Sequence, residues 1–399
     1  MAKRHNKGGI GAYLLTYDMN LIAAVIFLIV FGLIMIYSAS YYIAGMSAAF
    51  HNNPTYFLES QVKYSLIGLI LMLGVANFDY HNWRYFALLA FLGAVILILL
   101  LKVPGLGVTV KGATRWIRVP GIGQFQVAEP VKTAMIVFSA ALICRCAGKL
   151  NNLKAFGKVL LPSILVFVLV WRISNNMSTA MIILGICFAM AFVVYPKYWP
   201  FLLMVLVGAV VLIGLLYYTK HMTDADSGFR LTRIQAWLDP YSYESDTAYQ
   251  SLQSLYAIGS GGLMGKGLGN SIQKLGRIPE PYNDMIFAIL CEELGIFGAG
   301  LVILLFIYLL YRLYSITQTA EDLFGRLLCI GVFAHVALQV LLNLLVVTSM
   351  IPTTGVTLPF FSYGGTATVF LLIEIGMVLN VEKKSRLKRE GEIREESIS

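Results

Sequence analysis

Hydrophobic runs long enough to cross a membrane dominate this chain and alternate with polar connections. A hydrocarbon core of about 30 Å needs roughly 20 apolar residues in a helix. Ten runs reach or approach this length, at 21–44, 64–78, 85–102, 131–147, 158–172, 178–195, 198–218, 284–313, 324–348 and 356–381. The pattern predicts an all-α integral membrane protein of about ten transmembrane helices. It forms a single polytopic domain over 1–399, with a large loop at 219–284 between the seventh and eighth spans.

The composition supports this prediction and excludes an ordinary water-soluble globule. Hydrophobic residues make up 58% of the chain, charged residues 13%, and the mean hydropathy is +0.76, whereas soluble domains carry roughly 25% charged residues. The five cysteines show no spacing typical of a disulfide framework or a zinc site. The chain also lacks a histidine cluster and a Gly-x-Ser-x-Gly motif, which disfavours a metalloenzyme and a serine-nucleophile enzyme.

Basic residues indicate the orientation in the membrane, because short cytoplasmic loops retain Lys and Arg. Basic clusters occur in the N-terminal tail 1–20, in the connection at 145–158 and in the C-terminal tail 382–399, all on one side of the predicted membrane. Both termini are therefore predicted to be cytoplasmic, and the loop 219–284 to be extracellular. The net charge of +9 is attributed to this topology and to affinity for anionic membrane lipids, and no nucleic-acid partner is expected.

Asp284 lies where the large polar loop meets the next span, directly after the sequence Pro-Glu-Pro-Tyr-Asn. A carboxylate at the mouth of a transmembrane helix is costly to keep charged unless it has a partner or a task, which makes it a candidate functional residue. Asp is also a common N-cap residue. The position alone leaves catalysis and helix capping as alternatives.

The first polar segment, 103–130, interleaves basic residues with Trp116 at glycine-rich turns. Such a surface suits lipid headgroups, and Trp116 is either a substrate contact or an aromatic anchor at the membrane interface. Glu129 and Lys132 are three residues apart where a helix begins. They share a helix face, and the spacing predicts that they pair.

The second polar segment, 219–284, is rich in glycine around Lys266. This density permits the close backbone approach that phosphate-binding loops need, although no nucleotide-binding motif is present. Arg230 and Arg233 are three residues apart and form either a two-pronged diphosphate clamp or an ordinary solvated helix face.

The third polar segment, 349–366, contains two prolines, three glycines and several hydroxyl residues, and includes Ser362 and Tyr363. It predicts a broken or re-entrant segment, which is tolerated at membrane depth only where protein or a wet cavity surrounds it. Polar residues inside the predicted spans are interpreted as groups that pair across helices. They are Glu292, Glu293, His335, Gln339, Asn343 and Glu374. For Glu292 and Glu293 a functional role is left open.

Several long motifs carry a family resemblance. They are Gln-Ser-Leu-Tyr-Ala-Ile-Gly-Ser-Gly-Gly-Leu-Met-Gly-Lys-Gly-Leu-Gly, Pro-Glu-Pro-Tyr-Asn-Asp-Met-Ile-Phe-Ala, Lys-Gly-Ala-Thr-Arg-Trp-Ile and Ile-Pro-Thr-Thr-Gly-Val-Thr-Leu-Pro-Phe-Phe-Ser-Tyr-Gly-Gly. With them, nearly the whole chain resembles the shape, elongation, division and sporulation family of membrane glycosyltransferases (FtsW, RodA, SpoVE). The motifs are closer to the FtsW and SpoVE branch than to RodA.

The resemblance implies a ten-span enzyme of the bacterial cytoplasmic membrane that polymerises lipid II on the outer face. It would extend a lipid-linked glycan strand beside a class B penicillin-binding transpeptidase. By motif match Asp284 is the general base. Trp116, Glu129, Lys132, Ser362 and Tyr363 fall on matched motifs and would shape the substrate pockets.

Arg233 and Lys266 are further candidates, for contacts with the lipid diphosphate. No cofactor is required by the motifs, and assistance by a divalent cation stays open.

The chain departs from the family pattern at Asn176, where members commonly carry an aspartate, at Val127 and Ala128 before Glu129, and at Asn283. Two other functions are alternatives: a lipid II flippase and a non-catalytic scaffold of the division machinery. A flippase needs a wide cationic cavity, whereas the polar and acidic groups here gather toward the exported side. That distribution favours the enzyme.

Overall fold

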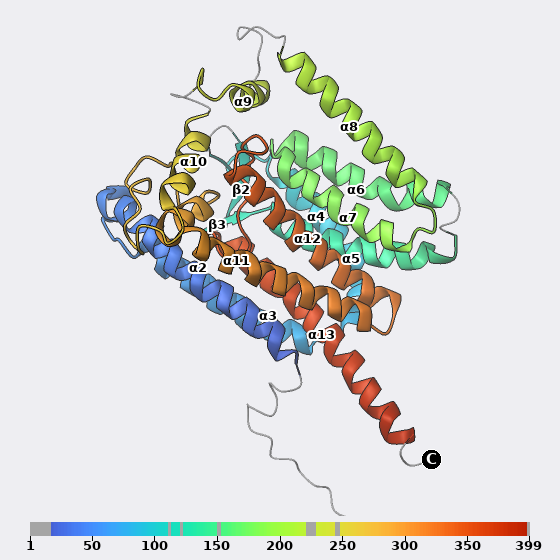
Figure 1. The fold of residues 1–399 in the computed structure, drawn as a ribbon. Coiled ribbons are helices and arrows are strands. Elements are labelled where there is room, and N and C mark those ends of the chain that lie inside the picture. Colours follow the sequence, from blue (N-terminus) through green and yellow to red (C-terminus); the bar gives the residue numbers. More distant parts are fainter. Residues whose placement is uncertain are drawn as a thin grey trace, which may run out of the picture.

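The computed structural model describes residues 17–110, 113–119, 123–149, 153–220, 229–243 and 248–396. Each of the ten hydrophobic runs corresponds to a helix in these ranges (Figure 1). These helices are α2 (Met19–Met46), α3 (Tyr56–Asn77), α4 (Trp83–Leu100), α5 (Ala128–Cys146), α6 (Leu153–Ile173), α7 (Met177–Val194), α8 (Trp199–Lys220), α11 (Ile286–Thr319), α12 (Leu323–Val347) and α13 (Gly365–Glu396). The prediction of a multi-span helical membrane protein is confirmed.

Nine helices of the described residues are long and apolar enough to cross a membrane. The remaining helix of the ten, α5, carries Glu129, Lys132 and Arg145. Its neighbours α4, α7 and α12 pack around it, and most of its residues are buried. Protein atoms rather than lipid therefore surround Glu129 and Lys132. Charged side chains inside a membrane are tolerated in such surroundings.

A small antiparallel sheet was not predicted and qualifies the expectation of an all-α fold. Strands β1 (Gly107–Val110), β2 (Ala113–Val119) and β3 (Gly123–Gln126) lie in that order between α4 and α5. Trp116 pairs with Val108 on one side and Gln126 on the other. The pairing satisfies backbone groups of the connection at the membrane edge, where an unpaired N–H or C=O is costly.

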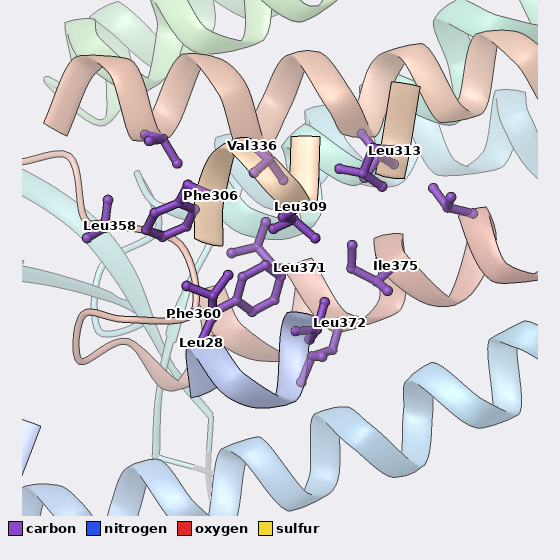
Figure 2. Close-up of a cluster of buried hydrophobic side chains, with 14 of the residues drawn as sticks. Leu28, Phe306, Leu309, Leu313, Val336, Leu358, Phe360, Leu371, Leu372 and Ile375 are labelled. Carbon is purple, nitrogen blue, oxygen red and sulfur yellow. The ribbon is translucent and has the colours of Figure 1, made fainter. Parts of the chain in front are cut away.

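The core of the bundle lies between α2, α11, α12 and α13 (Figure 2). Its fully buried side chains come from all four helices and from the segment before α13. They include Leu28, Phe306, Leu309, Leu313, Val336, Leu358, Phe360, Leu371, Leu372 and Ile375. By contrast, α8 is the least buried span and lies along the outside of the bundle in Figure 1.

Segment 348–364, between α12 and α13, is largely non-helical, as the sequence predicts. Side chains from the surrounding helices donate hydrogen bonds to its carbonyl groups. The donors and acceptors are Asn343 to Val356, Gln339 to Thr357, Ser178 to Thr354, Arg233 to Thr353 and Trp237 to Ser349. Because protein donors replace water at these carbonyls, irregular backbone is tolerated here.

Candidate functional site

Asp284 lies in the turn that leads into α11. The helix begins at Ile286, its N-cap residue is Met285, and it has no side-chain capping bond. The carboxylate Oδ1 accepts a hydrogen bond from Gln250 Nε2 at 3.3 Å. Asn343 Nδ2 donates to the Asp284 carbonyl at 2.8 Å. The structure therefore does not support the capping alternative, and it leaves a half-buried carboxylate on a firmly held backbone.

Short helices of the large loop bring polar groups to this turn. Gln250 belongs to α10 (Tyr249–Gly261), and Arg233 belongs to α9 (Phe229–Leu238). Arg233 Nη1 donates to the Thr353 carbonyl at 3.2 Å. Burial lowers the pKa of Arg233, and the charge of nearby Asp284 opposes that effect. A guanidinium and a carboxylate thus act on each other beside the non-helical segment.

Trp237 fixes α9 on the same segment. Its indole Nε1 donates to the Ser349 carbonyl at 2.8 Å. Arg233 and Trp237 are one helical turn apart on α9, so both side chains extend from one face of the helix. That face carries the polar contacts between α9 and segment 348–364.

Glu129 and Lys132 form the predicted ion pair, with 2.9 Å between carboxylate and ammonium and both side chains buried. Lys132 Nζ also lies 3.4 Å from Gln339 Oε1, and Gln339 Nε2 donates to the Thr357 carbonyl at 3.1 Å. A continuous polar chain therefore connects α5 through α12 to the non-helical segment. Removing either charge would leave the other buried and unpaired, which is strongly destabilising.

The pairing of lone polar residues is confirmed elsewhere in the spans. His335 Nδ1 and Glu374 Oε2 lie 2.7 Å apart, and Thr133 Oγ1 donates to the other Glu374 oxygen at 2.7 Å. These contacts join α5, α12 and α13. His335 and Glu374 are both fully buried, which fits a packing role.

Ser362 and Tyr363 hold the non-helical segment in shape. Ser362 Oγ accepts from the Leu358 N–H at 2.8 Å. The Tyr363 N–H donates to the Tyr282 carbonyl at 2.9 Å, and the Tyr363 ring contacts those of Phe57 and Tyr282. Burial raises the pKa of both tyrosines, so both stay neutral. These contacts connect the residues just before Asp284 to the segment that faces it.

Trp116 is half-buried on β2. The sheet is joined to α13 through the Gln126 N–H, which lies 3.5 Å from Thr366 Oγ1. Phe125 and Phe370 add an edge-to-face ring contact. The substrate contact predicted for Trp116 stays a prediction.

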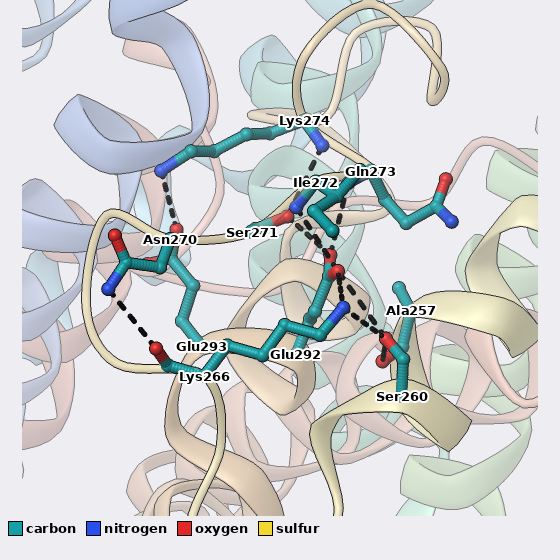
Figure 3. A network of polar contacts seen from close by, with 10 residues as sticks. All are labelled: Ala257, Ser260, Lys266, Asn270, Ser271, Ile272, Gln273, Lys274, Glu292 and Glu293. Carbon is teal, nitrogen blue, oxygen red and sulfur yellow. Dashed lines mark hydrogen bonds and ion pairs between the residues drawn. The ribbon is translucent and has the colours of Figure 1, made fainter.

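Lys266 has a protein partner, which bears on its predicted diphosphate contact. Its ammonium lies 2.6 Å from Glu292 Oε1 (Figure 3). The same carboxylate accepts from Ser271 Oγ and from the Ile272 and Gln273 N–H groups. A cation neutralised in this way is poorly suited to hold a diphosphate, and we interpret Lys266 as an anchor of the loop.

A second anchor lies beside the first. Lys274 Nζ is 2.6 Å from Glu293 Oε1 and 3.0 Å from Ser38 Oγ, and the Lys274 and Glu293 side chains have no exposed surface. Ser38 belongs to α2 and Glu293 to α11. The pair therefore fastens the loop that ends at Asp284 to two membrane helices.

Glycines allow the backbones to meet at these anchors. A Cβ at Gly261 would lie 2.0 Å from the Cys291 carbonyl oxygen, and one at Gly265 would lie 2.2 Å from that of Glu293. Gly295 interrupts α11 with φ 64° and ψ −163°, a conformation that only glycine adopts readily. The glycine-rich motif thus serves backbone packing here.

Sequence reasoning missed two contributors to the site, Gln250 and Lys274. Gln250 lies three residues before the glycine-rich family motif, and its partner Asp284 is 34 residues away. Asn176, which stands where the family has an aspartate, caps α7 by accepting from the Thr179 N–H at 3.1 Å. Asn176 therefore caps this helix without a negative charge. Among the described residues, His, Cys, Asp and Glu form no group of three that could hold a metal ion.

Comparisons with known proteins agree with this architecture. The family model described as cell cycle protein, of the FtsW, RodA and SpoVE type, matches residues 19–387. The probable peptidoglycan glycosyltransferase FtsW of Geobacter sp. (strain M18) is 38% identical over 93% of this chain and 98% of its own length. Stage V sporulation protein E of Bacillus subtilis (strain 168) is 36% identical over 92% and 98%.

Solved structures share the fold. A chain of a peptidoglycan synthase complex matches with a TM-score of 0.75 and 22% identity, over 93% of this chain and 99% of that one. The rod shape determining protein RodA of Thermus thermophilus matches with a TM-score of 0.65 and 24% identity, over 94% and 99%. Since the family model and the relatives cover almost the whole chain, this protein belongs to the FtsW, RodA and SpoVE family of cell cycle proteins.

Proposed function

We propose that this protein is a peptidoglycan glycosyltransferase that polymerises lipid II on the outer face of the bacterial cytoplasmic membrane, for cell division, shape or sporulation. The observation that carries the proposal is the setting of Asp284. Its carboxylate accepts from Gln250, its backbone is held by Asn343, and Arg233 lies close enough to act on its charge. The FtsW relative, a probable peptidoglycan glycosyltransferase, supports the same type of reaction.

Asp284 is the general base in this proposal. The 4-hydroxyl of the acceptor sugar attacks the anomeric carbon of the donor, and the hydroxyl proton passes to the Asp284 carboxylate. The bond from the anomeric carbon to the diphosphate oxygen breaks, and the lipid diphosphate leaves with the electron pair. Because Asp284 is only half-buried, the acceptor hydroxyl has access to it.

Arg233 is the candidate cation for the departing diphosphate. A guanidinium presents paired donors that match phosphate oxygens. Its contact with the Thr353 carbonyl holds it beside the non-helical segment that faces Asp284. In this proposal, Trp116, Ser362 and Tyr363 shape the lipid and sugar pockets. The Glu129–Lys132 pair keeps the non-helical segment in place through Gln339.

The arrangement of the ends of the bundle supports the proposed orientation. The start of α2 and the end of α13 lie at the end of the bundle away from α9 and α10 (Figure 1). Basic residues cluster at the C-terminal end, as expected for the cytoplasmic side. Both termini are then cytoplasmic, and the loop 219–284 faces the cell exterior, where lipid II is polymerised.

A class B penicillin-binding transpeptidase is the proposed partner. The structural neighbour is part of a peptidoglycan synthase complex that coordinates polymerisation and crosslinking. A glycosyltransferase that releases uncrosslinked strands needs such a transpeptidase nearby. The growing lipid-linked glycan strand would pass from one protein to the other.

The decisive test replaces Asp284 by Asn, which keeps its size and removes the ionisable carboxylate. Polymerisation of purified lipid II should fall by about 10²–10⁴-fold, as is typical of losing a general base. The matched control is Asp239→Asn, an exposed carboxylate of the same loop, which should retain activity. Activity is measured as glycan product on gels, with and without the partner transpeptidase.

Three outcomes would contradict the proposal. Near-normal polymerisation by Asp284→Asn would remove the catalytic role. A folded wild-type protein that forms no glycan, with or without the partner, would favour the flippase or the scaffold. Normal complementation of cell division by Asp284→Asn would point to the scaffold in particular.

A further inference from the structure

A polar cavity lies at the end of the bundle opposite Asp284. It has a volume of about 260 Å³ and is lined by His81, Arg84, Tyr85, Arg145, Asp322 and Phe324. Arg84 and Tyr85 lie in the first turn of α4, Arg145 in the last turn of α5, and Asp322 is the N-cap residue of α12. The ends of α4 and α5 thus place one arginine each around the opening, and the start of α12 closes its third side.

The two arginines outnumber the one carboxylate, Asp322, that lines the cavity. Both side chains are exposed, and within the described ranges neither makes a hydrogen bond or an ion pair. The acidic neighbours already have partners. Asp322 Oδ1 accepts from the Tyr80 hydroxyl at 2.6 Å and from the Gly325 N–H at 3.1 Å.

The remaining charged neighbours pair with one another at the edge of the cavity. Asp79 pairs with Lys384 at 2.7 Å and with His81 at 2.8 Å. The other His81 nitrogen lies 3.9 Å from Asp322. The carboxylates of Asp79 and Asp322 are therefore engaged with donors other than the arginines. The cavity keeps two guanidinium groups for an anion from outside the chain.

The cavity opens next to a lipid-facing surface. Tyr85 is 83% exposed, and Phe86, Leu88 and Leu89 on the same helix are also exposed. An exposed tyrosine at the end of a transmembrane helix is typical of the headgroup level. Acyl chains lying along the apolar side of α4 would bring a headgroup to Arg84.

We propose that this cavity binds the phosphate of an anionic phospholipid headgroup in the cytoplasmic leaflet. Two guanidinium forks match phosphate oxygens in both charge and geometry. The cytoplasmic leaflet carries the anionic lipids that attract basic residues near the surface. The volume exceeds the roughly 30 Å³ that one water occupies in the liquid, so a phosphate group fits. The site is independent of the glycosyltransferase reaction proposed above.

The test titrates phosphatidylglycerol into the purified full-length protein in neutral detergent and follows binding by thermal unfolding and native mass spectrometry. A bound lipid stabilises the native state in proportion to its occupancy. The double variant Arg84→Gln with Arg145→Gln should bind at least about tenfold more weakly, since each basic residue near a membrane surface contributes about fivefold to anionic-lipid binding. The matched control is Arg326→Gln, an exposed arginine of α12 that does not line the cavity.

Phosphatidylcholine with the same acyl chains should bind more weakly than phosphatidylglycerol, and inorganic phosphate alone should give no comparable stabilisation. The double lysine variant, Arg84→Lys with Arg145→Lys, keeps both charges without the forks and should bind with intermediate affinity. It also provides a measurement if the glutamine variant fails to fold.

Three results would overturn the proposal. The first is equal loss of binding in the Arg326→Gln control, which would mean non-specific charge attraction. The second is unchanged binding in the folded double glutamine variant. The third is equal stabilisation by inorganic phosphate, which would identify a soluble ligand in place of a lipid.

Discussion

The anchors beneath Asp284 give a quantitative prediction about stability. Lys274 and Glu293 are fully buried and paired at 2.6 Å. Replacing Lys274 by Met would leave the Glu293 carboxylate without its cation in the protein interior. Breaking a buried pair from one side costs about 3–5 kcal/mol. We therefore expect Lys274→Met to lower the free energy of unfolding by about that amount.

The neighbouring pair provides the matched control. The Lys266 side chain is 30% exposed, so solvent screens its charge, whereas the Glu292 side chain is fully buried. After Lys266→Met, Glu292 keeps the Ser271 hydroxyl and two backbone N–H donors. The loss should be about 1 kcal/mol or less, as for a partly exposed ion pair. The same Lys→Met substitution should thus cost much less stability at the partner of Glu292 than at the partner of Glu293.

A double variant separates the attraction between Lys274 and Glu293 from the cost of burying a single unpaired charge. Lys274→Met combined with Glu293→Met removes both buried charges at similar volume. Its loss should be well below the sum of the two single losses, because no uncompensated charge is left. Ser38 then loses its acceptor but can bond a carbonyl within its own helix.

The measurement is unfolding in detergent micelles titrated with sodium dodecyl sulfate, followed by circular dichroism. If Lys274→Met lowers the free energy of unfolding no more than Lys266→Met does, burial does not decide the strength of these ion pairs. Lys274→Met should also lower polymerisation, because the loop it fastens ends at the proposed base.

Two further predictions concern the substrate groove and the topology. Trp116→Ala should weaken polymerisation by the folded, membrane-inserted protein, whereas Trp199→Ala, which removes an exposed ring of α8, should not; equal activity of the two variants would make Trp116 an interface anchor. In a cysteine-free background, a cysteine at exposed Asn270 should react with an impermeant thiol reagent outside intact cells, and one at Gln318, in the last turn of α11, should not. The reverse labelling pattern would place Asp284 on the cytoplasmic side.

The sequence by itself determined the membrane architecture of this protein. In lipid every backbone group must be satisfied within its own segment, so apolar runs of about 20 residues become helices whatever surrounds them. The Glu129–Lys132 pair was predictable for the same reason, because residues three apart in a helix are neighbours. The irregular segment before α13 was also predictable, since its prolines and glycines interrupt an apolar pattern.

Tertiary structure decided the contacts between distant segments. Only the fold brings Lys266 to Glu292, 26 residues away, and Lys274 to Ser38, across 236 residues. The pairing of β2 with β1 and β3 likewise depends on strand register, which the four-residue strands β1 and β3 specify weakly. Local periodicity carries no information on which helix ends meet. Whether a cation can bind substrate or is already neutralised by the protein was therefore decided only when the chain packed.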